Sequence, residues 1–399
     1  MLGTVGKSAL LLMCLASSSF AQEYDSGTSD SEIKLGQTQP YGGPVSAAAT
    51  TGFASTAYFE AINKKGGING RKVTLISLDD GYSPPKTVEL TRKLVEGDEV
   101  FAIYGSVGTP TNAAVQKYLN GKKVPQLFIA TGASRFADPT AFRWTIPMLP
   151  GYAAEARATA RYVLSSVPDP KIAILYQNDD LGKDFVSGFK SGLGENAKRL
   201  IVSEQSFEVT SPTIESQLVT AKASGANVFY FAGTQKFGAM QIRGRHEIGW
   251  KPLNLVCSIA SGVETVLKPA GLDRAEGIIS TGYAKDPSDP RWQNDDDIKE
   301  YNAWMRDNLP GKNPSDAGYI TGYQASYLMA HVLRQAGSKL TRDNLLEIAT
   351  HLKDMKVPLL LPGITVTTRP DDYSTINRFW IQRFESGRWT PIGDGVQGG

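Results

Sequence analysis

From about residue 32 onward, short runs of β-branched and apolar residues alternate with longer segments whose apolar positions recur at helical spacing. One of these runs, Lys171–Tyr176, contains a continuous apolar stretch of the kind buried on both faces of a sheet. Strands that alternate with helices pair in parallel through right-handed crossovers. The pattern therefore predicts an α/β fold built from doubly wound parallel sheets.

The alternation occurs twice, with a break at Pro147–Pro150, which predicts two lobes of the same construction. Before the break, the expected strands are Ile33–Thr38, Val73–Leu78, Val100–Tyr104 and Gln126–Ala130, and the expected helices are Ser46–Lys64, Pro84–Glu96 and Thr111–Asn120. After it, the expected strands are Lys171–Tyr176, Ile201–Phe207, Val228–Phe231 and Leu253–Cys257, and the expected helices begin near Gly151 and span Phe185–Gly194, Thr213–Ser224 and Lys236–Ile248.

The final third of the chain gives a weaker pattern. It predicts a strand at Ile278–Tyr283, helices at Asp295–Asn308, Gly318–Gln335 and Asn344–Leu352, and a terminal hairpin of Asn377–Phe384 and Trp389–Ile392. These pieces could form a third independent lobe. We favour the interpretation that they complete the two lobes already begun, which requires the chain to cross between the lobes more than once.

The N-terminus has the features of a secretory signal peptide. A basic residue, Lys7, precedes the short apolar run Ala9–Ala16, and Ser19-Phe20-Ala21 offers small residues for cleavage after Ala21. We therefore expect residues 1–21 to be removed, residues 22–31 to be a flexible leader, and the mature protein to be periplasmic. Cleavage would leave Cys257 as the one remaining cysteine, so no internal disulfide is expected.

Composition narrows the classes of function. The 42 basic and 40 acidic residues give a net charge of +2, and no basic cluster indicates binding to nucleic acid or a membrane surface. The chain has three histidines and no Gly-x-Ser-x-Gly, Cys-x-x-Cys or His-x-x-x-His spacing. We therefore expect a protein that is not an enzyme, and that holds no metal or cofactor.

The segment Asn63–Arg71 carries the most informative motif. Gly66-Gly67 predicts a helix end, because glycine adopts the left-handed cap conformation, and Asn69-Gly70 predicts a tight turn before the next strand. The whole string Asn-Lys-Lys-Gly-Gly-Ile-Asn-Gly-Arg, with Asp79-Asp80 downstream, resembles the signature of the leucine/isoleucine/valine-binding family of periplasmic solute receptors. Further segments resemble the family's strand-end loops in the same order: Gln37–Gly43, Tyr104–Thr109, Phe128–Ser134 and Asn178–Gly182.

The resemblance implies a type I periplasmic binding fold with three crossovers between lobes, which we place near Leu149, Glu276 and Leu361. Lobe 1 would then comprise residues 32–148 with 277–360, lobe 2 residues 149–276 with 361–393, and residues 394–399 a tail. It also implies capture of a solute and its delivery to the permease of an ABC transporter, and we expect the protein to be a monomer. No Gly-x-x-x-x-Gly-Lys-Ser/Thr string is present, so the ATPase would be another subunit.

Ligands of open α/β sheets bind beyond the carboxyl ends of the strands. The residues expected there on lobe 1 are Tyr41, Ser106, Val107, Gly108, Thr131, Gly132 and Ser134. On lobe 2 they are Tyr152, Asp180, Leu181, Thr234, Gln235, Phe237, Ile259 and Ala260. Small residues let the backbone approach a ligand, and a helix N-terminus just past the Ser106–Thr109 loop would suit a carboxylate.

The sequence departs from amino-acid-binding relatives at Ser258–Ser261. The resemblance implies an acidic residue there that pairs with the ligand's ammonium group, but the next acid is Glu264. An unpaired buried ammonium is costly, so we favour an aromatic or other apolar carboxylate as ligand. A branched-chain amino acid or an amide is the alternative, with Asp179 or Asp180 supplying the acid. A ligand-sensing receptor domain of the same fold is the other open function.

Overall fold

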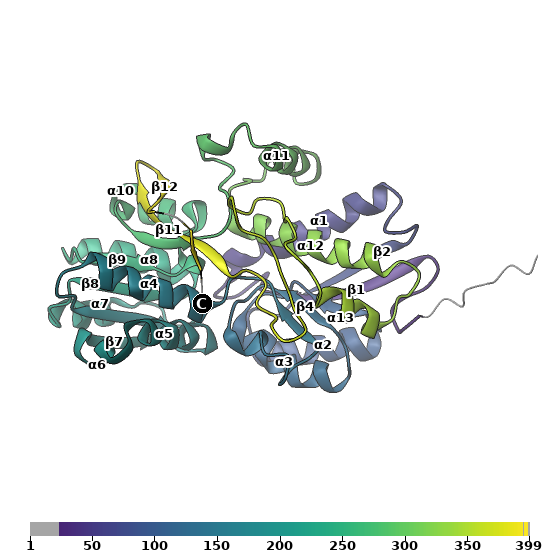
Figure 1. Cartoon of the computed structure of the whole chain (residues 1–399), viewed down its shortest axis with the longest axis horizontal. Helices are drawn as coiled ribbons and strands as arrows, with labels where there is room; N and C mark the ends of the chain where they lie inside the picture. The colour runs from purple at the N-terminus through teal and green to yellow at the C-terminus, as the bar shows by residue number, and fades with distance from the viewer. Residues whose placement is uncertain (1–23, 394, 398–399) are drawn as a thin grey trace, which may run out of the picture.

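The computed structural model describes residues 24–393 and 395–397, which form two α/β lobes side by side (Figure 1). Lobe 1 is built on a five-stranded parallel sheet in the order β2-β1-β3-β4-β5. Its strands are β1 (Glu32–Gln39), β2 (Lys72–Asp79), β3 (Ala102–Tyr104), β4 (Gln126–Ile129) and β5 (Thr145–Pro147). The predicted parallel pairing is confirmed in this lobe.

Lobe 2 is built on a larger sheet in the order β12-β11-β10-β9-β8-β6-β7, with β13 pairing β11. The strands from β7 to β10 pair in parallel, whereas β11 and β12 form the predicted antiparallel hairpin at one side. Their bounds are β6 (Ile172–Gln177), β7 (Ile201–Phe207), β8 (Val228–Ala232), β9 (Leu253–Val256), β10 (Ile279–Gly282), β11 (Arg378–Glu385), β12 (Arg388–Pro391) and β13 (Val396–Gln397).

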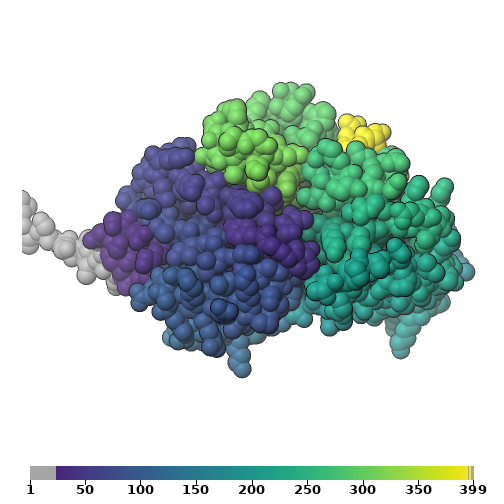
Figure 2. Space-filling model, turned by 180° about the vertical axis from the view of Figure 1, so that it is seen from behind, coloured from purple at the N-terminus to yellow at the C-terminus, as the bar shows by residue number. Residues whose placement is uncertain are grey.

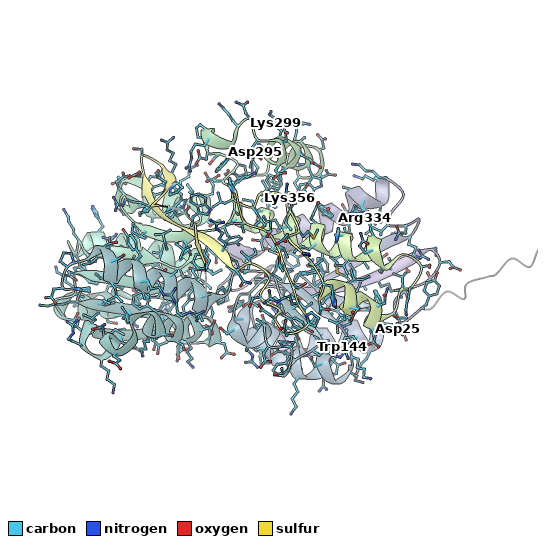
Figure 3. All side chains as sticks on the ribbon, viewed as in Figure 1. Asp25, Trp144, Asp295, Lys299, Arg334 and Lys356 are labelled. Atoms are coloured by element: carbon cyan, nitrogen blue, oxygen red, sulfur yellow. The ribbon has the colours of Figure 1, made fainter. Side chains whose placement is uncertain are left out.

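Helices cover both faces of each sheet. Those of lobe 1 are α1 (Thr50–Lys64), α2 (Pro84–Arg92), α3 (Thr109–Gly121), α11 (Asp296–Asn308), α12 (Ala317–Ala336) and α13 (Arg342–Ala349). Those of lobe 2 are α4 (Tyr152–Ser166), α5 (Asp180–Leu193), α6 (Ala197–Leu200), α7 (Glu215–Ala223), α8 (Gln235–Glu247), α9 (Lys268–Ala270) and α10 (Leu272–Ala275). Helix α11, which carries Lys299 and follows Asp295, projects from the body of the molecule (Figure 3). None of the helices in the described ranges is long and apolar enough to cross a bilayer.

The chain crosses between the lobes three times, and the structure moves two of the expected crossing points. The first crossing lies near Leu149, between β5 and α4. Strand β10 pairs with β9 in lobe 2, so the second crossing follows Gly282 rather than Glu276. Residues 361–375 stay with lobe 1, where Met355 pairs with Val366, so the third crossing lies just before β11 rather than at Leu361. Sequence patterns locate a strand but not the sheet that it joins.

The expected flexible leader is instead bound to lobe 1 from Tyr24 onward. Tyr24 forms a β-bridge with Leu340, and its hydroxyl accepts a hydrogen bond from Arg71 at 2.9 Å. Asp25, at the outer edge of lobe 1 (Figure 3), accepts from the backbone amide of Arg342 at 2.7 Å. The expected signal peptide, residues 1–21, lies outside the described residues. Of the expected tail, Val396–Gln397 pairs with β11 as β13.

The motif after α1 forms the predicted helix end, turn and strand. Gly66 and Gly67 have φ angles of 97° and 77°, and Asn69 and Gly70 have φ angles of 50° and 77°. A Cβ atom on Gly67 would lie 2.0 Å from the carbonyl oxygen of Arg71, so no other residue fits there without moving the backbone. The motif thus sets the connection into β2 and has no contact with the space between the lobes.

Helices α4 and α5 pack closely because glycines on α5 face the backbone of α4. A Cβ atom on Gly188 would lie 2.4 Å from the backbone of Ala153, and one on Gly192 would lie 2.6 Å from the carbonyl oxygen of Arg157. The N-terminus of α5 is capped by Asp179, whose side chain accepts from the amides of Leu181 and Gly182. These contacts fix where Leu181, at the start of α5, stands relative to Tyr152, at the start of α4.

Replacing Gly188 by alanine should therefore destabilise lobe 2. Alanine favours a helix by about 1 kcal/mol over glycine, but overpacking against backbone costs about 1–3 kcal/mol. We expect Gly188→Ala to lower the free energy of unfolding in urea by about 1–2 kcal/mol. The neighbouring exposed Ser187→Ala is the control and should leave it within about 0.5 kcal/mol. Equal stability of the two variants would contradict the close packing.

Candidate functional site

A cavity of about 1210 Å³, partly open to solvent, lies between the two lobes and receives side chains from both. Viewed from behind, lobe 1 (purple to blue) abuts lobe 2 (teal), with the green residues of the last third of the chain above the junction (Figure 2). The cavity is reached by loops that follow the carboxyl ends of strands in both parallel sheets, which is where ligands of such sheets bind. The two lobes therefore face a common space.

On lobe 1, the cavity wall is built around the start of α3. Gly108, with a φ angle of 111°, leads directly into Thr109, the first residue of the helix, and both line the cavity together with Val107 and Ala130. The first amides of a helix have no partner within it and carry partial positive charge. Val107 and Ala130 pair as a β-bridge, so the loops after β3 and β4 are held side by side. This part of the wall can accept an anionic group such as a carboxylate.

On lobe 2, the wall combines apolar side chains with hydroxyl groups. Tyr152, Leu181 and Ile259 lie near Thr234 and Ser258, each at the start of a helix or turn. Burial raises the pKa of the Tyr152 hydroxyl far above its usual value, and it raises the pKa of Tyr283 to about 12. Both phenols therefore stay protonated at neutral pH. Their rings give the cavity flat apolar surfaces on which an aromatic or aliphatic body can pack.

Charged groups are sparse in this wall. Lys285 and Asp286 are the charged residues among those that line the cavity, and both belong to the second crossing. Lys285 is largely buried and its Nζ is 2.7 Å from Asp295 and 3.2 Å from Asp297, so its charge is already balanced. Within the described residues no group of histidine, cysteine, aspartate and glutamate side chains is arranged to hold a metal ion.

A buried carboxylate stands directly behind the lobe 2 wall. Glu155, in the first turn of α4, is 1% exposed and accepts hydrogen bonds from the amide of Ser258 at 2.7 Å and from its hydroxyl at 2.6 Å. Burial raises the pKa of Glu155 to about 7, although the Ser258 and Thr281 groups oppose that shift. Glu155 lies 103 residues before Ser258 in the chain, so no local pattern connects them.

Seven of the fifteen residues expected at the site line the cavity. On lobe 1 they are Val107 and Gly108, and on lobe 2 they are Tyr152, Leu181, Thr234, Gln235 and Ile259. All seven occupy the first positions after a strand or at the start of a helix. Their contact with a ligand stays a prediction.

The other eight expected residues lie outside the cavity wall, in contact with other parts of the protein. Three have partners within lobe 1: Tyr41 bonds Ser77 and stacks on Phe53, Ser106 accepts from the amide of Thr38, and Thr131 bonds Thr109. Gly132 packs on the carbonyl of Pro150, just after the first crossing. Phe237 packs on Phe207, and Ala260 packs on Gly238, inside lobe 2. Ser134 and Asp180 contact the opposite lobe.

The structure also adds residues that the sequence pattern missed. Tyr82, in the loop after β2, has a φ angle of 61° and lines the cavity from lobe 1. Tyr82 follows the carboxyl end of β2, after Asp79-Asp80-Gly81, so the strand-end rule could have identified it from the sequence. Other lining residues come from α1, the second crossing, the N-terminus of α12 and the terminal hairpin, and include Thr51, Ala284, Ile320, Thr321, Gln382 and Trp389. No strand-end rule points to these, because Thr51 lies on a helix of lobe 1 and the chain reaches the others only after it has crossed between the lobes.

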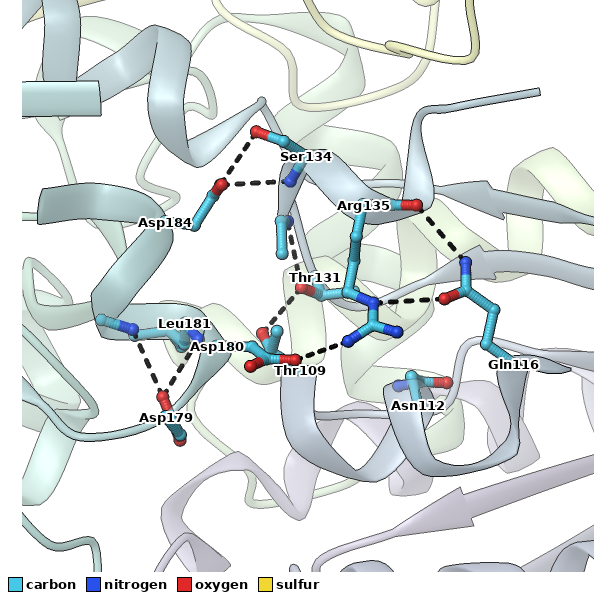
Figure 4. Close-up of polar contacts among 12 residues, drawn as sticks. Thr109, Asn112, Gln116, Thr131, Ser134, Arg135, Asp179, Asp180, Leu181 and Asp184 are labelled. Carbon is cyan, nitrogen blue, oxygen red and sulfur yellow. Dashed lines mark hydrogen bonds and ion pairs between the residues drawn. The ribbon is translucent and has the colours of Figure 1, made fainter. Parts of the chain in front are cut away.

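Direct contacts join the lobes beside the cavity (Figure 4). Arg135 of lobe 1 forms an ion pair of 2.7 Å with Asp180 of lobe 2, and Ser134 donates from its amide and its hydroxyl to Asp184 at 3.1 Å. On another side, Val45, Ala48, Tyr82 and Val107 form an apolar cluster that packs on Val209 of lobe 2. The lobes are therefore closed on each other in this structure.

Removing the Arg135–Asp180 pair should favour an open arrangement. Both side chains are more than one-third exposed, so the pair contributes at most about 1 kcal/mol, which corresponds to about a fivefold shift in the closed-to-open ratio. Spin labels at exposed Lys117 and Lys198, one in each lobe, would report this ratio as a distance distribution.

Arg135→Ala and Asp180→Ala should each lengthen the mean distance, and the double variant should add little to either. The control is Lys93→Ala, which breaks an ion pair of the same 2.7 Å length within lobe 1. If the control lengthens the distance as much as Arg135→Ala does, the pair between the lobes has no part in closure.

This chain is similar in sequence and in fold to known periplasmic binding proteins. The family model for periplasmic binding proteins matches residues 32–388. A leucine/isoleucine/valine-binding protein homologue of Brucella melitensis is 28% identical over 364 residues, which cover 90% of this chain and 92% of that protein.

Two solved structures share the fold at low sequence identity. A branched-chain amino acid ABC transporter protein from Thermus thermophilus with bound valine has a TM-score of 0.82 and 16% identity, covering 92% of this chain and 96% of that one. A fatty acid ABC transporter substrate-binding protein from Thermomonospora curvata has a TM-score of 0.77 and 18% identity, covering 94% and 95%. The solved structures show that the chain shares their type I fold, and the family model, which matches nearly all of the described residues, shows that the chain belongs to the periplasmic binding protein family.

Proposed function

We propose that this protein captures a small carboxylate with an apolar or aromatic body in the cavity between its lobes, and delivers it to the permease of an ABC transporter. The observation that carries the proposal is the make-up of the cavity. Apolar side chains from both lobes surround it, and the N-terminus of α3 opens onto one wall. An acid would place its carboxylate at the amides near Gly108 and Thr109 and its body against Tyr152, Leu181 and Ile259.

The ligand would stabilise the closed arrangement, because only that arrangement satisfies the contacts of both walls at once. The permease would then recognise the joined surface of the two lobes, and a separate ATPase subunit would supply the energy. A ligand-sensing receptor would use the same closure, so the distinction between transport and sensing depends on the partner protein and not on the site.

A branched-chain amino acid or an amide is the second candidate ligand. The relatives support it, since one is described as a leucine/isoleucine/valine-binding protein homologue and another has valine bound. The fatty acid transporter protein is the counterexample among the structural neighbours, since its named solute has no amine.

A charge placed beside the start of α3 should separate carboxylates from other ligands. Ala130→Asp would put an anion next to Val107 and the α3 N-terminus, whereas Ala130→Asn would add the same bulk without charge. We expect carboxylate ligands to bind the aspartate variant at least about tenfold more weakly than the asparagine variant, a difference of about 1.4 kcal/mol.

The measurement is a thermal-shift titration. A ligand that binds only the folded state raises Tm, and at a concentration of a hundred times its Kd it adds about 2.7 kcal/mol to the free energy of unfolding. The panel contains benzoate, cinnamate, leucine, valine and isobutyramide. A ligand that stabilises both variants equally is not held by its carboxylate. If none of the carboxylates raises the Tm of the wild-type protein, the proposed function is wrong.

A further inference from the structure

Glu155 is the strongest feature of the molecule that the proposed function leaves unused. Its carboxylate is buried, and in the described part of the chain it accepts hydrogen bonds from the amide and hydroxyl of Ser258 and lies near the hydroxyl of Thr281, with no cation among these groups. A buried anion without a positive partner is costly, by several kcal/mol even after relaxation. A carboxylate placed in this way is therefore expected to meet a positive or hydrogen-bond-donating group at some stage of function.

The hydrogen bonds of Glu155 also set the polarity of the cavity wall. A serine hydroxyl has one hydrogen and two acceptor lone pairs. Ser258, which lines the cavity and is partly exposed to it, gives its hydrogen to Glu155 Oε2 at 2.6 Å. Only lone pairs are then left to face the cavity. Thr281 also lines the cavity, and its buried Oγ1 lies near Glu155 and has no hydrogen-bond partner among the described residues, so its hydrogen too is available to the carboxylate.

We infer that Glu155 is a specificity-determining residue, which acts through Ser258 to make this end of the cavity an acceptor for a cationic amine on the ligand. The inference rests on the proposed function and refines it. The ligand's carboxylate lies at the start of α3 on lobe 1, and its ammonium group lies at Ser258 on lobe 2. Ser258 contacts the amine, and Glu155 behind it supplies the charge that balances the amine.

Protonation would reverse this polarity. A protonated Glu155 can donate to Ser258, which frees the serine hydrogen to point into the cavity. The other titratable groups near Glu155 are Tyr230 on β8, Cys257 after β9 and Tyr283 after β10, and burial raises the pKa of each well above its usual value. Asp184 on α5 faces Tyr230 and not Glu155 itself. Between pH 6 and 8, Glu155 is thus the group in this cluster whose charge changes.

The sign of the pH effect follows from the raised pKa. Below about pH 7 Glu155 is mainly protonated, so an ammonium-bearing ligand must displace a proton in order to bind. Affinity for such a ligand should therefore rise about tenfold between pH 6 and pH 8 and then level off. Affinity for a ligand without the amine should change little over the same range.

Two pairs of compounds test the inference by isothermal titration calorimetry on the mature protein. Leucine is compared with 4-methylpentanoate, and phenylalanine with 3-phenylpropanoate, because the members of each pair differ in the amine alone. In at least one pair, the wild-type protein should bind the amino acid at least about tenfold more tightly than the deaminated acid, and only the amino acid should show the pH dependence.

The variant Glu155→Gln keeps the anchor, because glutamine can still accept from the amide of Ser258, but its NH₂ group donates to the serine hydroxyl and reverses its polarity. This variant should lower the affinity for the amino acid at least about tenfold and abolish its pH dependence. The affinity for the deaminated acid should change less than about threefold. The matched control is Glu264→Gln. Glu264 is the first acid after Ser258 in the sequence, and it pairs with Lys268 instead. This control should keep the wild-type preference.

The failure of this inference can be told apart from failure of the proposed function. If Glu155→Gln weakens both members of a pair equally, Glu155 has only a structural role. Tighter binding of the deaminated acids by the wild-type protein would also overturn the inference, as would binding of neither pair while other carboxylates raise Tm. In each of those cases the carboxylate-binding function stands. If no carboxylate binds at all, both fall together.

Discussion

Parallel pairing of strands is the constraint on which this molecule depends. In each lobe, parallel strands bring their carboxyl ends to one edge of the sheet, and the loops that follow them share that edge. Because three crossings tie the two sheets together, the two edges face each other across one cavity. Val107 and Gly108 on one side and Thr234 and Ile259 on the other thus line the same cavity, although more than a hundred residues separate them in the chain.

Solvation of charge explains the composition of the cavity. A cleft that closes removes its walls from water, and a charge left there without a partner is costly. The walls accordingly use hydroxyls, aromatic rings and helix amides, and Lys285 is balanced by Asp295 and Asp297. Glu155 departs from this rule, since it is buried and no cation is found among its partners in the described residues. Because Glu155 lies directly behind the cavity wall and not in a distant part of the core, its charge can affect which ligand binds.

Among the residues at the strand edges, some join the two lobes and others line the cavity. Ser134 and Asp180 were expected to touch the ligand, because they follow strands at the correct edge. In the structure they contact the opposite lobe directly, with Arg135 and Asp184 as partners. Residues at a strand edge can serve either purpose, and the choice depends on whether the opposite lobe or the cavity lies in front of them. Sequence position alone does not distinguish the two.

The sequence by itself determined the class of fold and the type of each main element, because these depend on local periodicity, glycine turns and buried apolar runs. It also located seven residues of the cavity wall, since strand ends of parallel sheets have a common edge. Only the tertiary structure decided that β10 joins lobe 2, that the leader packs on lobe 1 from Tyr24, and that Glu155 supports Ser258. Each of these depends on which surfaces meet after the chain has crossed between lobes, and no local pattern of residues records that meeting.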